Sequence, residues 1–127
     1  MSDKEAPLIC IVEDDQPVRQ SLVALVTSAG YQAATFADAE SFLATNSVAK
    51  AAFLIVDVRL PAMSGIDLLH QLRSTGANPR AVILTGHADS AELRKSKLLD
   101  DVQLLSKPAA PEELLDLISA AVIPDAE

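Results

Sequence analysis

The sequence predicts an α/β protein built around a parallel sheet of five strands, the (βα)5 pattern. Short apolar runs alternate with longer stretches in which apolar residues recur at helical spacing, which is typical of repeated strand–helix units. Half of the residues are hydrophobic but only 3% are aromatic, so aliphatic side chains must form the core. At 127 residues the chain has the length of one domain, and we expect a single domain over residues 1–127.

Five runs are predicted to be strands. The runs 8–12, 51–56 and 81–84 are almost wholly apolar, as expected of strands that helices cover on both faces. The runs 31–36 and 102–106 contain polar positions, so we place them at the edges of the sheet. With right-handed crossovers, these placements predict the flavodoxin-like strand order 2-1-3-4-5, with helices on both faces and a crevice between the first and third strands.

The spacing of apolar residues predicts helices between the first strands. The stretch 17–29 has one apolar face, Pro17 suits its first turn and Gly30 its C-terminal stop. Asp38 is a suitable N-terminal cap for a short helix that contains Phe42.

The second half of the chain contains three further candidate helices. Ser64 and Asp67 are three residues apart, the spacing of a capping box. Another helix begins at Pro111 and has a clear apolar face. The stretch 88–101 keeps only a loose helical period, so a short helix with few core contacts is expected there.

Composition excludes several classes of function. A net charge of −8 and a pI near 4.6 oppose direct binding to nucleic acid or to anionic membranes. The single cysteine, Cys10, lies in an apolar run and is expected to be a buried thiol in a reducing compartment. No stretch has the length of a membrane span and the first residues do not resemble a signal peptide, so we expect a cytoplasmic protein.

Polar residues follow four of the predicted strands. Glu13 and Asp14 follow the first strand, Asp57 closes the third, Thr85 follows the fourth and Lys107 follows the fifth. Because the carboxyl ends of parallel strands meet at one edge of the sheet, we expect these side chains to lie close together.

Three neighbouring carboxylates favour a metal site. Two unit charges 4 Å apart repel by about 4 kcal/mol at an effective dielectric constant near 20, and a divalent cation removes that repulsion. Oxygen ligands alone indicate Mg²⁺ rather than zinc. His70 and His87 lack the spacing of zinc ligands.

An aspartate beside Mg²⁺ is a competent nucleophile toward phosphorus and would form an acyl phosphate. Lys107 and the hydroxyl of Thr85 would then pair with phosphoryl oxygens. Each feature has an ordinary explanation by itself, since acidic residues favour helix N-termini and Thr-Gly is common in turns. Their joint occurrence, each at the end of its own strand, favours a phosphoacceptor site.

These residues resemble the receiver domain of two-component response regulators. The stretches 11–15, 55–65, 84–87 and 106–108 carry the resemblance, and the Asp-x-x-x-Pro-x-x-x-Gly motif in the second of them is especially specific. The resemblance covers essentially the whole chain. It is greatest to receivers of the nitrogen-fixation regulator type, which are attached to transcription factors, although this chain could also stand alone.

Position by position, the resemblance implies a phosphoacceptor and a metal site. Asp57 would accept the phosphoryl group from a sensor histidine kinase or a phosphotransfer protein. Asp14 and Asp57 would bind Mg²⁺ directly, the backbone carbonyl of Arg59 would be the remaining protein ligand, and Glu13 would act through a water molecule.

The resemblance also implies a switch. Thr85 would supply the switch hydroxyl, and Lys107 would pair with the phosphate and precede a cis peptide bond to Pro108. The output would be a changed surface that a downstream protein or output domain contacts. The chain is therefore not expected to be a turnover enzyme.

Departures from the family pattern cluster near the last strand. Leu104 stands where the family usually has Tyr or Phe, Ala109 stands where an aromatic residue is common, and 99–101 replaces the usual small-residue turn. One interpretation is neutral drift. The other is a specialised partner or homodimer surface on the fourth-helix, fifth-strand, fifth-helix side, with Leu98, Leu99 and Leu104 as contacts.

The sequence leaves two alternative functions. A phosphohydrolase of the haloacid dehalogenase type needs a second aspartate two residues after the nucleophile, where this chain has Arg59. A receiver that serves as a docking module without phosphorylation would not need Asp14, Asp57, Thr85 and Lys107, which are all present.

Overall fold

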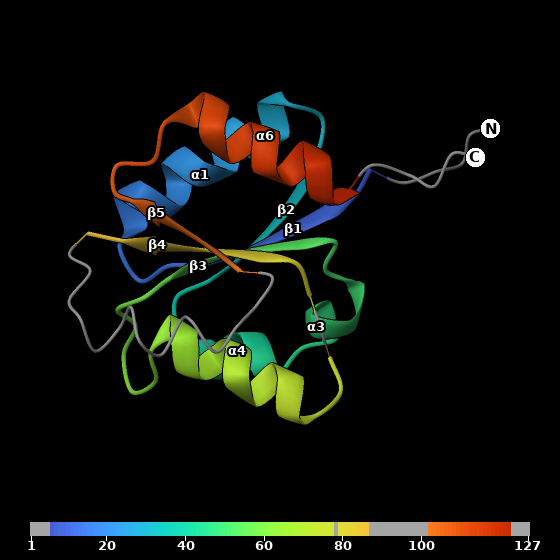
Figure 1. Cartoon of the computed structure of the whole chain (residues 1–127), viewed down its shortest axis with the longest axis vertical. Coiled ribbons are helices and arrows are strands. Elements are labelled where there is room, and N and C mark those ends of the chain that lie inside the picture. Colours follow the sequence, from blue (N-terminus) through green and yellow to red (C-terminus); the bar gives the residue numbers. More distant parts are fainter. Residues whose placement is uncertain (1–5, 78, 87–101, 123–127) are drawn as a thin grey trace.

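A five-stranded parallel sheet lies between two layers of helices in the computed structural model, which describes residues 6–77, 79–86 and 102–122 (Figure 1). The strand order is β2-β1-β3-β4-β5 and every pairing is parallel, which confirms the predicted topology. The strands are β1 (Leu8–Val12), β2 (Gln32–Phe36), β3 (Phe53–Asp57), β4 (Ala81–Thr85) and β5 (Gln103–Ser106).

Burial follows the predicted division into central and edge strands. Every residue of β3 and β4 is buried, and so are the last four residues of β1. The edge strands β2 and β5 have no fully buried residue. The central strands are apolar because helices cover both of their faces, whereas each edge strand also meets solvent.

Helices α1 (Gln16–Ser28) and α6 (Pro111–Val122) cover one face of the sheet, and α3 (Ser47–Lys50) and α4 (Gly65–Ser74) lie on the other (Figure 1). The short helix α2 (Ala39–Leu43) contributes to the same core cluster as α4. The sheet therefore separates two cores, one with α2 and α4 and one with α1 and α6. The sequence did not predict α3, which is a single turn without a side-chain cap.

Side-chain caps set where three helices begin. Asp15, Asp38 and Ser64 each accept a hydrogen bond from the backbone N–H three residues later, at 3.2, 2.7 and 3.0 Å. The caps at Asp38 and Ser64 confirm the predictions, and α1 begins one residue before the predicted Pro17. Each bond satisfies a donor that the first turn of a helix leaves without a partner.

Some expectations fall outside the described residues. The expected helix in 88–101 is one of them, together with Leu98 and Leu99. Leu104 is described, and its half-buried side chain packs against the core cluster on the α4 side. Within the described ranges, no helix is both long enough and apolar enough to cross a bilayer.

Candidate functional site

The parallel strands bring the predicted site residues to one edge of the sheet. Glu13 and Asp14 directly follow β1, Asp57 ends β3, Thr85 ends β4 and Lys107 directly follows β5. Glu13, Asp57 and Thr85 are 1%, 6% and 4% exposed, and these are the three buried polar or charged residues in the described part of the chain. Buried polar side chains at the ends of apolar strands are costly unless they are paired, so their gathering here indicates a functional site.

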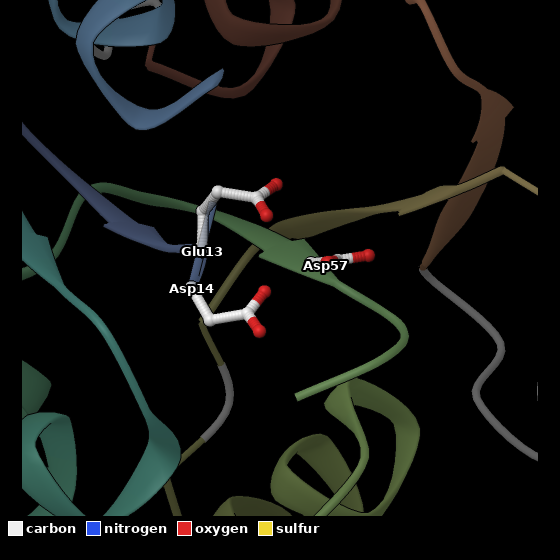
Figure 2. A group of neighbouring side chains, drawn as sticks. All are labelled: Glu13, Asp14 and Asp57. Atoms are coloured by element: carbon white, nitrogen blue, oxygen red, sulfur yellow. The ribbon is translucent and has the colours of Figure 1, made fainter. Parts of the chain in front are cut away.

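Three carboxylates form the centre of this site. Oxygen atoms of Glu13, Asp14 and Asp57 all lie within 4.8 Å of one another. Figure 2 shows the side chains of Glu13 and Asp14, at the end of β1, directed to the side on which Asp57 lies. Asp14 is exposed whereas the other two are buried, so the cluster opens to solvent on the Asp14 side.

Lys107 bridges the two buried carboxylates. Its Nζ lies 3.2 Å from Oε1 of Glu13 and 3.2 Å from Oδ2 of Asp57. Burial lowers the pKa of Lys107, but the charges of Asp57 and Glu13 outweigh it and hold the pKa above its ordinary value. The ammonium therefore stays protonated at neutral pH and offsets part of the repulsion between the carboxylates. The backbone N–H of Lys107 also donates to the carbonyl of Thr85 at 2.9 Å, and the peptide bond to Pro108 is cis.

Glu13 also has a raised pKa. Burial raises the pKa to about 7, and the charge of Asp57 adds to it, against the lowering effects of the Asp15 N–H and of Lys107. Oε1 of Glu13 is buried and forms an ion pair with Lys107. It accepts no hydrogen bond from the described residues. A buried acceptor without a hydrogen bond is costly, and this one borders the carboxylate cluster. The carboxylate oxygens of Glu13, Asp14 and Asp57 are the kind of ligand that a hard divalent cation prefers.

The remaining oxygen of Asp57 is held by the following loop. Its Oδ1 accepts a hydrogen bond from the backbone N–H of Arg59 at 3.3 Å. The N–H of Val58 donates to the carbonyl of Leu84 at 2.9 Å, which extends the pairing of β3 with β4 past Asp57. Both oxygens of Asp57 thus have a cationic or N–H neighbour.

Gly65 is one of two residues whose roles the sequence did not reveal. A Cβ atom at this position would overlap the carbonyl oxygen of Asp57 and a methyl group of Val56. The N–H of Gly65 donates to the carbonyl of Val58 at 3.0 Å, so the start of α4 packs directly on the end of β3. The sequence does place a glycine, a poor helix former, in the first turn of a predicted helix, and this could have indicated a close approach of the backbone.

Arg19 is the second such residue. Its Nη1 donates to the backbone carbonyl of Glu13 at 2.7 Å, from the second turn of α1 back to the end of β1. Helical spacing alone could not indicate this contact, because it joins a side chain to a backbone atom in the preceding loop.

An apolar groove runs beside the site. It has a volume of about 720 Å³ and lies between α1 and the connection from β5 to α6. Lys107, which contacts Asp57, is at its border. The lining residues are Val18, Ser21, Leu22, Ala24, Leu25, Leu84, Lys107, Pro108, Ala109, Pro111 and Leu114.

Comparison with known families matches residues 9–119 to the response regulator receiver domain. Among characterised proteins, the chain is 37% identical over 122 residues to the response regulator protein TodT of Pseudomonas putida, covering 96% of this chain and 53% of TodT. It is 32% identical over 111 residues to the transcriptional regulatory protein FixJ of Rhizobium meliloti, covering 87% of this chain and 54% of FixJ. The chain therefore spans about half the length of these relatives.

Solved structures agree with the fold. The crystal structure of FixJ-N superposes with a TM-score of 0.80 at 30% identity and covers 100% of both chains. The chemotaxis protein CheY4 of Vibrio cholerae superposes with a TM-score of 0.81 at 25% identity, covering 92% of this chain and 99% of CheY4. Both comparisons confirm the predicted arrangement of strands and helices.

Proposed function

The chain belongs to the response regulator receiver domain family, and from this membership we propose that it is the phosphoacceptor of a two-component system, with Asp57 as the phosphorylated residue. Receiver domains are signalling domains rather than turnover enzymes. One observation carries the assignment to Asp57. Its carboxylate lies at the end of a buried strand, 3.2 Å from the ammonium of Lys107 and within 4.8 Å of oxygens of Glu13 and Asp14.

The carboxylate cluster would hold Mg²⁺. Asp14 and Asp57 would bind it directly, the backbone carbonyl of Arg59 would be the third protein ligand, and Glu13 would act through a water molecule. The proximity of the three carboxylates and the buried Oε1 of Glu13 support this assignment. When bound, the ion would offset the negative charge on the oxygens of an incoming phosphoryl group.

Phosphoryl transfer would proceed by attack of an Asp57 oxygen on phosphorus. With a phosphohistidine donor, the bond between phosphorus and the imidazole nitrogen breaks and its electron pair stays on the imidazole, while Asp57 becomes an acyl phosphate. Lys107 is already 3.2 Å from Oδ2 of Asp57 and would pair with a phosphoryl oxygen. Thr85, buried at the end of the neighbouring strand β4, would supply the switch hydroxyl.

The donor would be a sensor histidine kinase or a phosphotransfer protein that docks over the apolar groove. A donor histidine must approach Asp57 closely, so the surface of the donor must cover the adjoining edge of the molecule. Lys107 lines the groove and also contacts Asp57, so the groove adjoins this edge. The apolar lining of the groove would lose its water in such a complex.

A surface around Leu104 would transmit the signal to a downstream protein, an output domain or a second copy of the chain. Phosphorylation adds roughly −1.5 to −2 charges, enough to bias two arrangements of a loop and its neighbours. Leu104 lies opposite Ile83, two residues before the switch residue Thr85, and packs half-buried on the core. We propose that Leu98 and Leu99, which lie outside the described residues, also contact the downstream partner. A downstream footprint confined to α1 and unchanged by Leu104→Ala would contradict this part of the proposal.

The central test is phosphorylation by a small phosphodonor. Wild type, Asp57→Asn and Asp116→Asn are incubated with acetyl phosphate and Mg²⁺, and intact masses are measured. Asp116, an exposed residue of α6, is the control for loss of a carboxylate elsewhere. One phosphoryl adduct is expected on wild type and Asp116→Asn, none on Asp57→Asn, and none when EDTA replaces Mg²⁺.

Two results would contradict the proposal. An adduct that persists in Asp57→Asn would place the acceptor elsewhere, and no adduct on wild type would favour a docking module that works without phosphorylation. Many turnovers of a phosphoester without a lasting adduct would instead indicate a hydrolase.

A further inference from the structure

The connection between β1 and α1 carries Asp14, and Arg19 holds it from the helix side. Nη1 of Arg19 lies 2.7 Å from the carbonyl oxygen of Glu13, a short distance typical of a charge-assisted hydrogen bond. Arg19 is half-buried, so this contact is less open to competition from water than one between fully exposed groups.

Asp14 depends on the backbone for its position. Within the described part of the chain, its carboxylate takes part in no hydrogen bond or ion pair. The carbonyl that Arg19 holds belongs to the peptide unit between Glu13 and Asp14. Because a peptide unit is planar, fixing that oxygen also fixes the amide nitrogen and the Cα atom of Asp14, from which its side chain leaves the backbone.

The neighbouring peptide units have other ties. The N–H of Glu13 donates to the carbonyl of Phe36 at 2.9 Å, and the N–H of Asp15 donates to Oε2 of Glu13 at 3.2 Å. The backbone N–H of Arg19 donates to the carbonyl of Asp15 at 2.9 Å, as the helix begins. Arg19 thus restrains the peptide unit between Glu13 and Asp14, and the hydrogen bonds of Glu13 and Asp15 restrain the backbone on either side of it.

We infer that Arg19 is a positioning residue for Asp14 in metal binding. The inference rests on the proposed function, because it assumes that Asp14 is a ligand of Mg²⁺. This ion requires near-ideal octahedral geometry, so the direction of a single carboxylate matters for affinity. Residues that orient metal ligands typically change affinity by 10- to 100-fold when they are replaced.

Electrostatics alone predicts the opposite effect. Removing a positive charge beside the carboxylates reduces repulsion of the cation and would strengthen Mg²⁺ binding. Positioning predicts weaker binding when the same residue loses its guanidinium. The sign of the change in Kd therefore separates the two roles.

The experiment is a calorimetric titration of Mg²⁺ into wild type, Arg19→Gln, Arg19→Lys and Arg80→Gln. Arg80 is exposed and precedes β4, at the end of the sheet opposite the site, so its replacement is a charge-matched control. We expect about tenfold weaker binding in Arg19→Gln and a change below about twofold in Arg80→Gln because salt screens distant charges. Arg19→Lys keeps a cationic donor and should recover part of the affinity.

A second readout needs no metal. In ¹⁵N relaxation of the metal-free protein, the order parameter of the Asp14 amide should fall in Arg19→Gln and stay unchanged in Arg80→Gln. If Arg19→Gln fails to fold, Arg19→Met keeps the aliphatic stem and should show the same two effects.

Unchanged or tighter Mg²⁺ binding in Arg19→Gln would overturn the inference and leave the proposed function intact. An unchanged Asp14 order parameter would overturn it as well. Absence of Mg²⁺ binding by wild type would overturn the proposed metal site and, with it, this inference.

Discussion

Glu13 and Lys107 form an ion pair in the folded chain, and both have raised pKa values. The sequence placed both residues at the strand ends but assigned Lys107 to the phosphate only. In the folded chain its ammonium lies between Glu13 and Asp57 before any phosphate is present. A phosphoryl group on Asp57 would compete with Glu13 for this ammonium, so the same lysine would serve both states of the site.

The raised pKa of Glu13 predicts a pH dependence of stability in the metal-free protein. The pKa is about 7 in the folded state and 4.5 in the unfolded reference. Between these values the folded state binds more protons, so the free energy of unfolding falls as the pH rises from about 4.5 to about 7 and then levels. At about 1.4 kcal/mol per pKa unit, the loss is on the order of 3 kcal/mol.

Urea denaturation in EDTA at a series of pH values measures this contribution, and Glu13→Gln provides the comparison. The variant lacks the titrating carboxyl, so its stability should fall less over the same pH window. Equal slopes in wild type and Glu13→Gln would show that burial does not raise this pKa as described.

Among the elements, α4 depends on a close approach to the end of β3. Ser64 caps the helix as its sequence spacing predicted, but the cap does not explain why the next residue is a glycine. Gly65 is required because the carbonyl of Asp57 fills the space that a side chain would occupy. The same contact fixes the backbone of the proposed phosphoacceptor.

Gly65→Ala should destabilise the protein by about 1–3 kcal/mol, because the added methyl group forces β3 and α4 apart. Gly86→Ala is the matched control, since no atom of the described residues lies within 4 Å of an added Cβ there and its φ is outside the positive range. The control should change stability by less than about 1 kcal/mol. Thermal and urea denaturation of both variants test this, and equal effects would contradict the packing argument.

Gly65→Ala should also slow phosphorylation by acetyl phosphate, since the shift of β3 moves Asp57 relative to Lys107. Normal phosphorylation together with lowered stability would limit the role of Gly65 to packing.

On the scale of the whole molecule, the apolar groove joins two parts of the chain that are far apart in sequence. Its lining comes from α1, from Leu84 of β4, and from the connection after β5 together with the start of α6. The residue pattern of neither segment predicts a groove, because the pattern of each is that of an amphipathic helix or a loop. The groove exists because α1 and α6 pack on the same face of the sheet (Figure 1). Lys107 is among its lining residues.

Ser21→Glu should weaken phosphoryl transfer from a protein donor by about tenfold, an effect of about 1.4 kcal/mol, because it introduces a charge into an interface that would be desolvated. Ser21 is exposed and lines the groove. Gln20→Glu adds the same charge to an exposed neighbouring position that does not line it. Transfer kinetics from a phosphorylated histidine kinase provide the measurement.

Acetyl phosphate separates docking from chemistry, because it needs no protein interface. Both variants should react with it at the rate of wild type. Equal loss of transfer from the protein donor in Ser21→Glu and Gln20→Glu would mean that general charge repulsion, rather than contact in the groove, limits the reaction.

The sequence by itself determined the strand order, the described helices other than α3, and the five strand-end residues. These follow from local patterns: apolar runs specify buried strands, caps specify helix starts, and parallel strands bring their carboxyl ends to one edge. The single turn of α3 was missed because four residues are too few for a helical period to appear.

Only the tertiary structure decided how those strand-end residues are held. Three contacts each join segments from different elements. Lys107 bridges Glu13 and Asp57, Arg19 donates to the Glu13 carbonyl, and Gly65 packs against the Asp57 carbonyl, where a side chain would not fit. Such contacts depend on distances across the fold, and the sequence pattern contains only distances along the chain. For that reason the sequence indicated which residues lie at the strand ends, whereas packing set how they are paired and oriented.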